Sequence, residues 1–183
     1  MSVYDRDPSN LCMVGSFFGI FSGLSATYNF LATPSASTTR LLTEATLWAL
    51  WFGFQAIGLL FIFWRSKQGI VLATSLIGLF GVGLEVTTAY NTLSGLGDLA
   101  LALIGMTVVY VLLVGYVVFL LSPKDPLARA TATLFGATGI LFLVNPPMGF
   151  VFLMLSNVLA SVFFILPSEN PLFNHSSSKK APS

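Results

Sequence analysis

One acidic residue, Glu85, lies inside a long apolar stretch that covers residues 69–90. It is the only acidic residue within the six hydrophobic stretches of the chain. A charged side chain at the centre of a bilayer costs at least about 2.5 kcal/mol, so such residues usually have a partner or a function. Glu85 is therefore a candidate for a proton or cation site. The alternative is an interfacial carboxylate that reaches outer water or pairs with Arg40.

A second group of polar side chains lies about halfway along the hydrophobic stretches, namely Gln55, Tyr110, Ser156 and Asn157. Amide groups do not easily face lipid, because lipid offers them no hydrogen-bond partner. They either hydrogen-bond neighbouring helices, at about 0.6 kcal/mol per bond on average in measured membrane proteins, or line a permeation path. We take these four residues as candidates for lining a path.

The elements that position these residues must be membrane-spanning helices, because 55% of the 183 residues are hydrophobic and only 8% are charged. A soluble domain carries about 25% charged residues, and a helix of about 20 apolar residues crosses a bilayer. The sequence predicts an all-α polytopic membrane helix bundle with six transmembrane helices at residues 11–32, 45–64, 69–90, 99–121, 127–144 and 148–166. The transmembrane domain (11–166) lies between a cytoplasmic N-terminus (1–10) and a disordered cytoplasmic tail (167–183).

The basic residues lie almost entirely on one side of this arrangement. Arg40 falls on the other side, and the rest are Arg6, Arg65, Lys67, Lys124, Arg129, Lys179 and Lys180. The positive-inside rule therefore places the N- and C-termini in the cytoplasm, and we expect an integral multi-pass protein of the plasma membrane. Trp48 and Trp51 near the outer end of the second helix, with Trp64 at its inner end, agree with the aromatic belts of membrane proteins.

Small residues recur at helical spacing in the first three helices. The glycines of these stripes are Gly15, Gly19, Gly23, Gly53, Gly78 and Gly81. Small residues let helix backbones approach closely in lipid, so the stripes are either packing faces or walls of a narrow pore. Glu85 shares the helix face of Gly78 and Gly81. It should therefore point into the bundle, closer to the outer surface than to the midplane.

Motifs of catalysis are missing from the sequence. It has no glycine-rich phosphate loop, HExxH helix, paired-carboxylate motif or serine elbow, and its one histidine, His175, lies in the tail. We therefore expect no enzyme activity, no catalytic residue, no metal site and no cofactor. A net charge of +1 does not indicate nucleic-acid binding.

Two features of the chain are shared with a known transporter family. It has six short hydrophobic stretches within 183 residues, and residues 7–13 read Asp-Pro-Ser-Asn-Leu-Cys-Met at the start of the first helix. In these features it resembles the acetate uptake transporter family, which includes the bacterial acetate and succinate permease and whose signature, Asn-Pro-x-Pro-Leu-Gly-Leu, opens the first helix. Pro8 and Leu11 match the signature, whereas Asp7, Asn10 and Cys12 depart from it. The resemblance implies a channel-like or proton-linked carrier of short monocarboxylates, assembled as a homo-oligomer with a pore in each subunit.

We predict that the chain is a transporter or channel for a small solute. The outer end carries Glu44, Glu85 and Asp98 against Arg40, and this negative charge attracts protons or cations and repels anions. A short carboxylate would therefore enter as the protonated acid or together with a proton. The competing hypothesis is a non-transporting membrane subunit, a scaffold or assembly factor of a membrane complex. The expected partners are the lipid bilayer, a small solute, and either further copies of the chain or membrane partner proteins, without nucleic acid.

Overall fold

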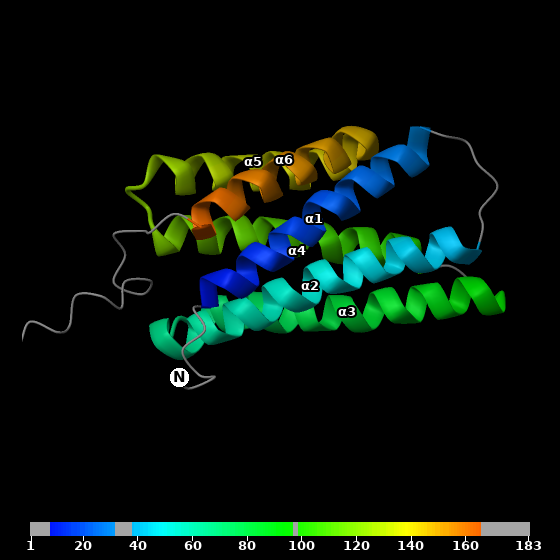
Figure 1. Cartoon of the computed structure of the whole chain (residues 1–183), viewed down its shortest axis with the longest axis horizontal. Helices are drawn as coiled ribbons and strands as arrows, with labels where there is room; N and C mark the ends of the chain where they lie inside the picture. The colour runs from blue at the N-terminus through cyan, green and yellow to red at the C-terminus, as the bar shows by residue number, and fades with distance from the viewer. Residues whose placement is uncertain (1–7, 32–37, 97–98, 166–183) are drawn as a thin grey trace, which may run out of the picture.

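Six α-helices make up the part of the chain that the structure describes, which is residues 8–31, 38–96 and 99–165 of a computed structural model. They are α1 (Pro8–Leu31), α2 (Thr38–Ser66), α3 (Gly69–Ser94), α4 (Ala100–Leu121), α5 (Pro126–Val144) and α6 (Pro146–Ile165) (Figure 1). Each of them is long enough and apolar enough to cross a membrane. This confirms the predicted fold class, an all-α multi-pass membrane protein with six transmembrane helices.

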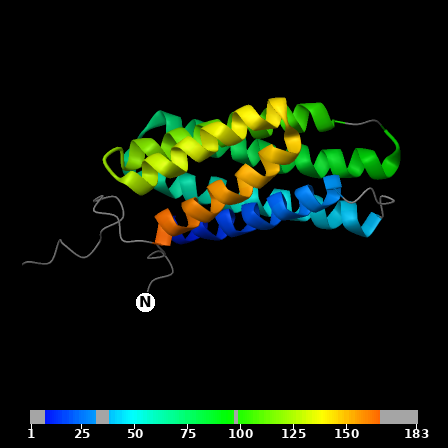
Figure 2. The ribbon, with the colours of Figure 1, turned by 90° about the horizontal axis from the view of Figure 1, so that it is seen from above.

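The helices form a closed ring in the order of the sequence. Each packs against the next one along the chain, and α1 packs against α6 to complete the ring. Two views show α1 and α6 side by side (Figure 1 and Figure 2). Within the described residues, helices that are not neighbours in the ring have no Cα atoms within 8 Å of each other. Side chains alone therefore fill the interior.

Glycines set the closest approaches between neighbouring helices. A methyl group added at Gly15 would lie 2.7 Å from the backbone nitrogen of Gln55 on α2. One added at Gly23 would lie 2.9 Å from the backbone oxygen of Phe150 on α6. Protein interiors are close-packed, so backbone this close leaves no room for a Cβ atom. Gly53 faces α3 with more space, because the nearest side-chain atom would be 3.6 Å away.

Local signals in the sequence fix several helix ends. Asp125 caps α5 by accepting a hydrogen bond from the backbone N–H of Leu127 at 2.8 Å. Pro126 occupies the first turn of that helix, where a missing N–H costs little. The helix α3 is followed by Gly95, whose φ of 66° is left-handed and therefore favours glycine.

Two helices extend furthest beyond their predicted bounds. α2 begins at Thr38 rather than at residue 45, and α3 continues to Ser94 rather than ending at residue 90. The added turns contain polar residues such as Arg40 and Glu44, which a search for apolar stretches leaves out. The 29 residues of α2 span about 43 Å at 1.5 Å per residue. This exceeds the hydrocarbon core of about 30 Å, so the polar turns have room outside it.

The two ends of the ring differ in charge. The α2–α3 and α4–α5 connections form what we call the basic end, with Arg65, Lys67, Lys124 and Arg129. We call the opposite end, where α2 begins with Glu44 and α3 finishes beyond Glu85, the acidic end. The predicted N-terminal segment (1–10) is helical from Pro8 onward. Outside the described residues lie Arg6, Asp98, Lys179, Lys180 and the predicted disordered tail, 167–183.

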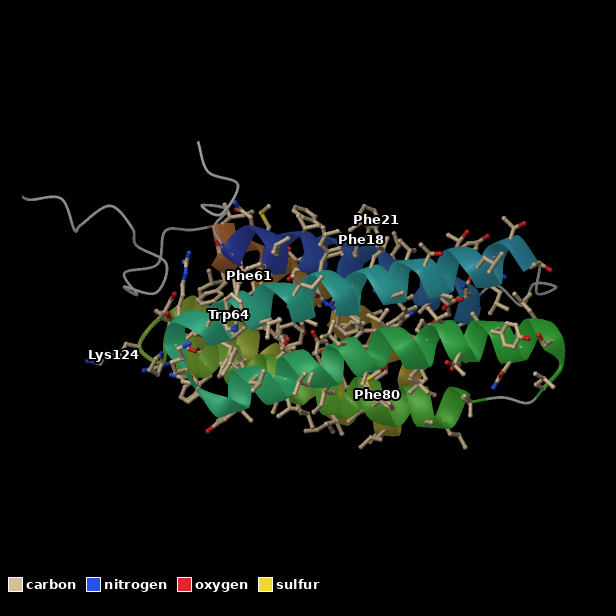
Figure 3. The ribbon with its side chains drawn as sticks, turned by 90° about the horizontal axis from the view of Figure 1, so that it is seen from below. Phe18, Phe21, Phe61, Trp64, Phe80 and Lys124 are labelled. Atoms are coloured by element: carbon tan, nitrogen blue, oxygen red, sulfur yellow. The ribbon has the colours of Figure 1, made fainter. Side chains whose placement is uncertain are left out.

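Large apolar side chains cover the outside of the ring. Phe21, Phe61, Trp64 and Phe80 are all at least 45% exposed and project outward from three different helices (Figure 3). A soluble protein would bury such side chains, whereas a bilayer solvates them. The chain is therefore an integral multi-pass membrane protein whose outer surface contacts lipid.

Two tryptophans that the sequence suggested for an aromatic belt lie in the interior instead. Trp51 is fully buried and Trp48 is 8% exposed. Because α2 starts earlier than predicted, both residues lie well inside the helix rather than at its end. They share the helix face of the buried Gln55, and this face is turned to the ring interior. The belt prediction is therefore wrong for Trp48 and Trp51, whereas Trp64 is 65% exposed.

Candidate functional site

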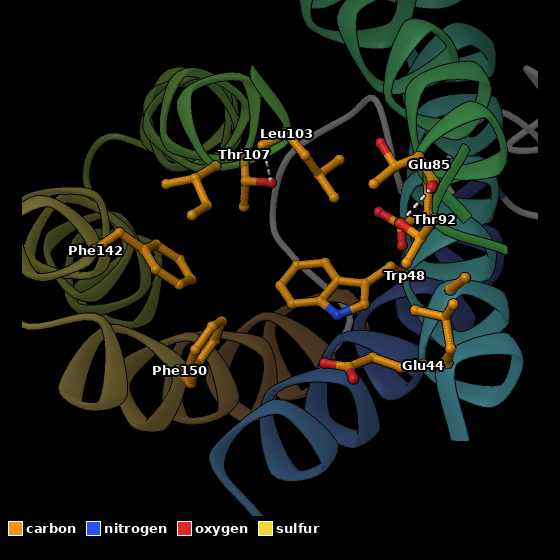
Figure 4. Close-up of a pocket in the computed structure, with 12 residues that line it drawn as sticks. Glu44, Trp48, Glu85, Thr92, Leu103, Thr107, Phe142 and Phe150 are labelled. Carbon is orange, nitrogen blue, oxygen red and sulfur yellow. Dashed lines mark hydrogen bonds between the residues drawn. The ribbon is translucent and has the colours of Figure 1, made fainter. Parts of the chain in front are cut away.

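A cavity of about 250 Å³ lies inside the ring at its acidic end (Figure 4). Side chains from five helices, α2 to α6, line it. They include Glu44 and Trp48 of α2, Glu85 of α3, Phe142 of α5 and Phe150 of α6. The volume is slightly below the roughly 300–1,000 Å³ of typical small-molecule sites, so the cavity suits a small solute.

Two carboxyl groups line this cavity. Glu85 is 6% exposed, and its Oε2 atom has no hydrogen-bond partner in the described part of the chain. Glu44 is partly buried and accepts a hydrogen bond from the side-chain amide of Asn29 on α1. The guanidinium group of Arg40 lies over the ring of Tyr28, 5.9 Å from its centre. Among the residues of the cavity wall, Glu85 is thus the one with a buried carboxyl oxygen that has no donor, and such a group is suited to take up a proton or a cation.

Three threonines complete the polar lining, and they present acceptors rather than donors. The hydroxyl groups of Thr88, Thr92 and Thr107 each donate to a backbone oxygen one turn earlier in their own helix, at 2.8 to 2.9 Å. Their hydrogens are thereby engaged, whereas lone pairs on their oxygens stay available. Apart from the indole N–H of Trp48, these lining side chains offer hydrogen-bond acceptors and negative charge.

On the side of the cavity that faces the basic end, three fully buried aromatic side chains from α2 and α4 meet inside the ring. We call Trp51, Phe52 and Tyr110 the aromatic layer, and their ring centres are 4.6 to 5.6 Å apart. Trp48 lines the cavity, and its ring lies 5.3 Å from that of Trp51. The aromatic layer therefore lies behind Trp48, on the side of the cavity that faces the basic end.

Two glycines of α3 make room for the aromatic layer. A methyl group at Gly81 would lie 3.1 Å from the ring of Phe52, and one at Gly78 would lie 2.9 Å from the hydroxyl oxygen of Tyr110. Gly81 and Gly78 lie about one and two helical turns from Glu85 toward the basic end. Glu85 is therefore about one helical turn closer to the acidic end than the aromatic layer is.

The predicted path residues Gln55, Tyr110 and Asn157 are all buried in the interior. The indole N–H of Trp51 donates to Oδ1 of Asn157 at 3.2 Å, and the Gln55 amide donates to the hydroxyl of Ser16 at 3.3 Å. These bonds join α2 to α6 and to α1, which favours the alternative that the amides hold helices together. Two buried atoms still have no hydrogen-bond partner among the described residues, namely Oε1 of Gln55 and the hydroxyl oxygen of Tyr110.

Three other predicted residues lie away from the cavity. The hydroxyl of Ser156 is 2.9 Å from that of Thr138, at the contact between α6 and α5. Pro8 begins α1, and Leu11 lies beside α2 near Gly58. The two positions that match the family signature are therefore at the basic end, opposite the cavity.

Several cavity residues were missed by the sequence analysis. Phe142 and Phe150 carry no distinguishing signal, because they are two of 17 phenylalanines in the chain. Trp48 does have one, since Trp51 and Gln55 follow it at the three- and four-residue spacing that places side chains on one helix face. A polar amide on that face indicates that the tryptophans beside it also face inward.

Beyond the aromatic layer, toward the basic end, the described interior is mostly apolar, with buried hydroxyl groups at Thr74, Ser75, Thr131 and Ser161 among the apolar side chains. The buried side chains in this half of the ring include Cys12, Leu59, Ile62, Val71, Val114, Val117, Leu121 and Phe163. A solute that passed the aromatic layer would have to separate these side chains.

Among the residues that the structure describes, no group of three or more His, Cys, Asp or Glu side chains could hold a metal ion. The chain matches no protein-family model, and comparisons with curated proteins and with solved structures found no match either. The resemblance to acetate uptake transporters therefore stays a hypothesis.

Proposed function

We propose that the chain is a transporter or channel for a small solute, which enters through the acidic-end cavity and moves along the ring axis past the aromatic layer. The cavity is the observation that supports this most. It lies inside a closed ring of helices, and its wall includes Glu85, whose buried Oε2 has no hydrogen-bond partner among the described residues. Membrane proteins keep ionisable groups in their interior mainly where these serve a substrate or ion pathway.

In this proposal, Glu85 binds the proton or cation that accompanies the solute or is the solute. The family resemblance would make the solute a short monocarboxylate such as acetate. Because Glu44 and Glu85 at the entrance repel an anion, acetate would enter as the neutral acid or with a proton bound at Glu85. The acidic end would face the outside of the plasma membrane, since the basic end follows the positive-inside rule.

Passage beyond the cavity requires the aromatic layer to rearrange. In the proposed movement, the ring of Trp51 turns and its 3.2 Å hydrogen bond to Asn157 breaks. The unpartnered oxygens of Gln55 and Tyr110 then become hydrogen-bond acceptors for the solute. Such gating by two alternative side-chain arrangements is common in proteins that move solutes.

A second candidate function is a non-transporting membrane subunit, built as a homo-oligomer or with membrane partner proteins. The many buried apolar side chains in the half of the ring nearer the basic end favour it, because a solute would have to separate them to pass. Under this hypothesis the interhelical bonds of Gln55 and Asn157 serve stability alone.

Purified protein in proteoliposomes distinguishes the two candidates. The measurement is uptake of labelled acetate, of a small neutral solute and of a small cation, each with and without a pH gradient. Transport predicts uptake of at least one of them, and a drop of tenfold or more in Glu85→Gln. Thr87→Val is the matched control, because Thr87 is exposed on the lipid side of the same helix.

No uptake of any of the three probes by the wild-type protein would reject the transport proposal and favour the subunit. Equal losses in Glu85→Gln and Thr87→Val would instead show that the loss does not depend on the cavity carboxyl group.

A further inference from the structure

We propose that the acidic-end cavity is a binding site for a small organic monocation, a primary ammonium ion with a short alkyl chain. The inference rests on the proposed function, because it names the class of solute that the cavity receives. It depends on three observations: the charge of the lining, the direction of its hydrogen bonds, and the separation of its polar and aromatic sides.

The charge and hydrogen-bonding capacity of the lining fit a cation that donates hydrogen bonds. An ammonium group has three donors and no acceptor. Glu44 and Glu85 both line the cavity, and Glu85 is 6% exposed with an Oε2 atom that has no partner among the described residues. The threonine hydroxyls donate to their own helices and so add acceptors. A carboxylate ligand would meet the two carboxyl groups of Glu44 and Glu85 there, with the indole N–H of Trp48 as a donor on the lining.

The apolar side of the cavity fits a short alkyl chain. Figure 4 shows Glu44 and Glu85 on one side, Phe142 and Phe150 on the other, and the Trp48 ring between them. The rings of Phe142 and Phe150 pack edge to face with centres 5.2 Å apart, and that of Trp48 lies 6.3 Å from Phe150. Aromatic faces attract cations and also contact alkyl groups. An ammonium group near Glu85 would therefore place its chain against the phenyl rings.

An inorganic metal ion is a weaker fit for this cavity. The described residues contain no group of three or more metal-ligating side chains. A divalent ion such as calcium needs six to eight oxygen ligands, whereas Glu44 already accepts a hydrogen bond from Asn29. The aromatic half of the lining would also remain without a contact if the ligand were a bare ion.

Binding to the purified full-length protein in detergent tests the inference without requiring transport. The probes are propylammonium, propanol and propionate, which have similar size and differ in charge, and potassium chloride keeps the ionic strength constant. Isothermal titration calorimetry measures each affinity. We expect propylammonium to bind at least tenfold more tightly than propanol or propionate. Its affinity should fall at least tenfold in Glu85→Gln and stay unchanged in Thr87→Val.

The inference is overturned if propionate or propanol binds as tightly as propylammonium, or if potassium displaces propylammonium with equal affinity. The wild-type comparison decides the matter even if Glu85→Gln does not fold. Propylammonium binding without flux in proteoliposomes supports the binding site while rejecting transport. Flux of acetate without propylammonium binding would support transport and reject the ammonium site. The two proposals can therefore fail separately.

Discussion

The change Gly15→Ala tests whether the ring depends on close approach between α1 and α2. The added methyl group would lie 2.7 Å from the backbone nitrogen of Gln55 and 3.1 Å from both its Cα and Cβ. Favourable carbon contacts occur at about 3.5–4.0 Å, and these backbone atoms cannot turn away as a flexible side chain would. The helices must therefore separate by several tenths of an ångström. Overpacking of this kind costs about 1–3 kcal/mol.

Equilibrium unfolding in mixed detergent and SDS micelles, followed by tryptophan fluorescence, measures this cost. A loss of 1–3 kcal/mol corresponds to a shift in the unfolding equilibrium of about 5- to 150-fold. Gly83→Ala is the control, because a methyl group there meets nothing within 4 Å. It should leave the unfolding free energy unchanged or slightly raised, since alanine is the better helix former. Equal stability of Gly15→Ala and Gly83→Ala would refute the reasoning.

Three further predictions concern the interior and the orientation. Tyr110→Phe removes a buried hydroxyl group that has no partner in the described residues. The unfolding free energy should therefore not fall, whereas solute flux should decrease. A clear loss of stability would contradict this prediction. Asn157→Leu leaves the indole N–H of Trp51 buried without its acceptor and should destabilise by about 1–3 kcal/mol. Trp51→Phe should lower the unfolding free energy less in the Asn157→Leu protein than in the wild type. If the two losses of unfolding free energy simply add, the hydrogen bond does not contribute to stability. An impermeant maleimide should label Ser94→Cys in intact cells and Lys124→Cys only after permeabilisation, whereas the opposite pattern would reverse the orientation.

The helix number and the direction of Glu85 were predictable because both depend on strong local signals. Lipid requires long apolar stretches, and Pro or Gly marks their ends, as at Gly95 and Pro126. The start of α2 was not predictable in the same way. Its first turns, with Arg40 and Glu44, are polar and extend a helix beyond the apolar stretch, so hydropathy alone places the boundary too late.

The composition of the candidate site was harder to predict, because a ring brings together residues far apart in the sequence. Gln55 and Asn157 stand out as amides in apolar helices, but nothing local shows that Trp51 connects α2 to Asn157. An apolar helix can present a tryptophan to lipid or to the interior with little difference in composition. The pairing of α1 with α6, which decides such contacts, also has no signature in either helix alone.

Closure of the ring between its first and last helices has a consequence for how the protein is made. The bond from Trp51 to Asn157 joins residues 106 positions apart, and Gly19 of α1 also lies against Asn157. Contacts of such long range form late in folding. Until α6 enters the membrane, α1 to α5 make an open arc whose inward polar groups face lipid or the insertion machinery. Synthesis of α6 is thus the step that closes the ring, and a nascent chain stopped before α6 would display an unassembled polar face for membrane quality control to recognise.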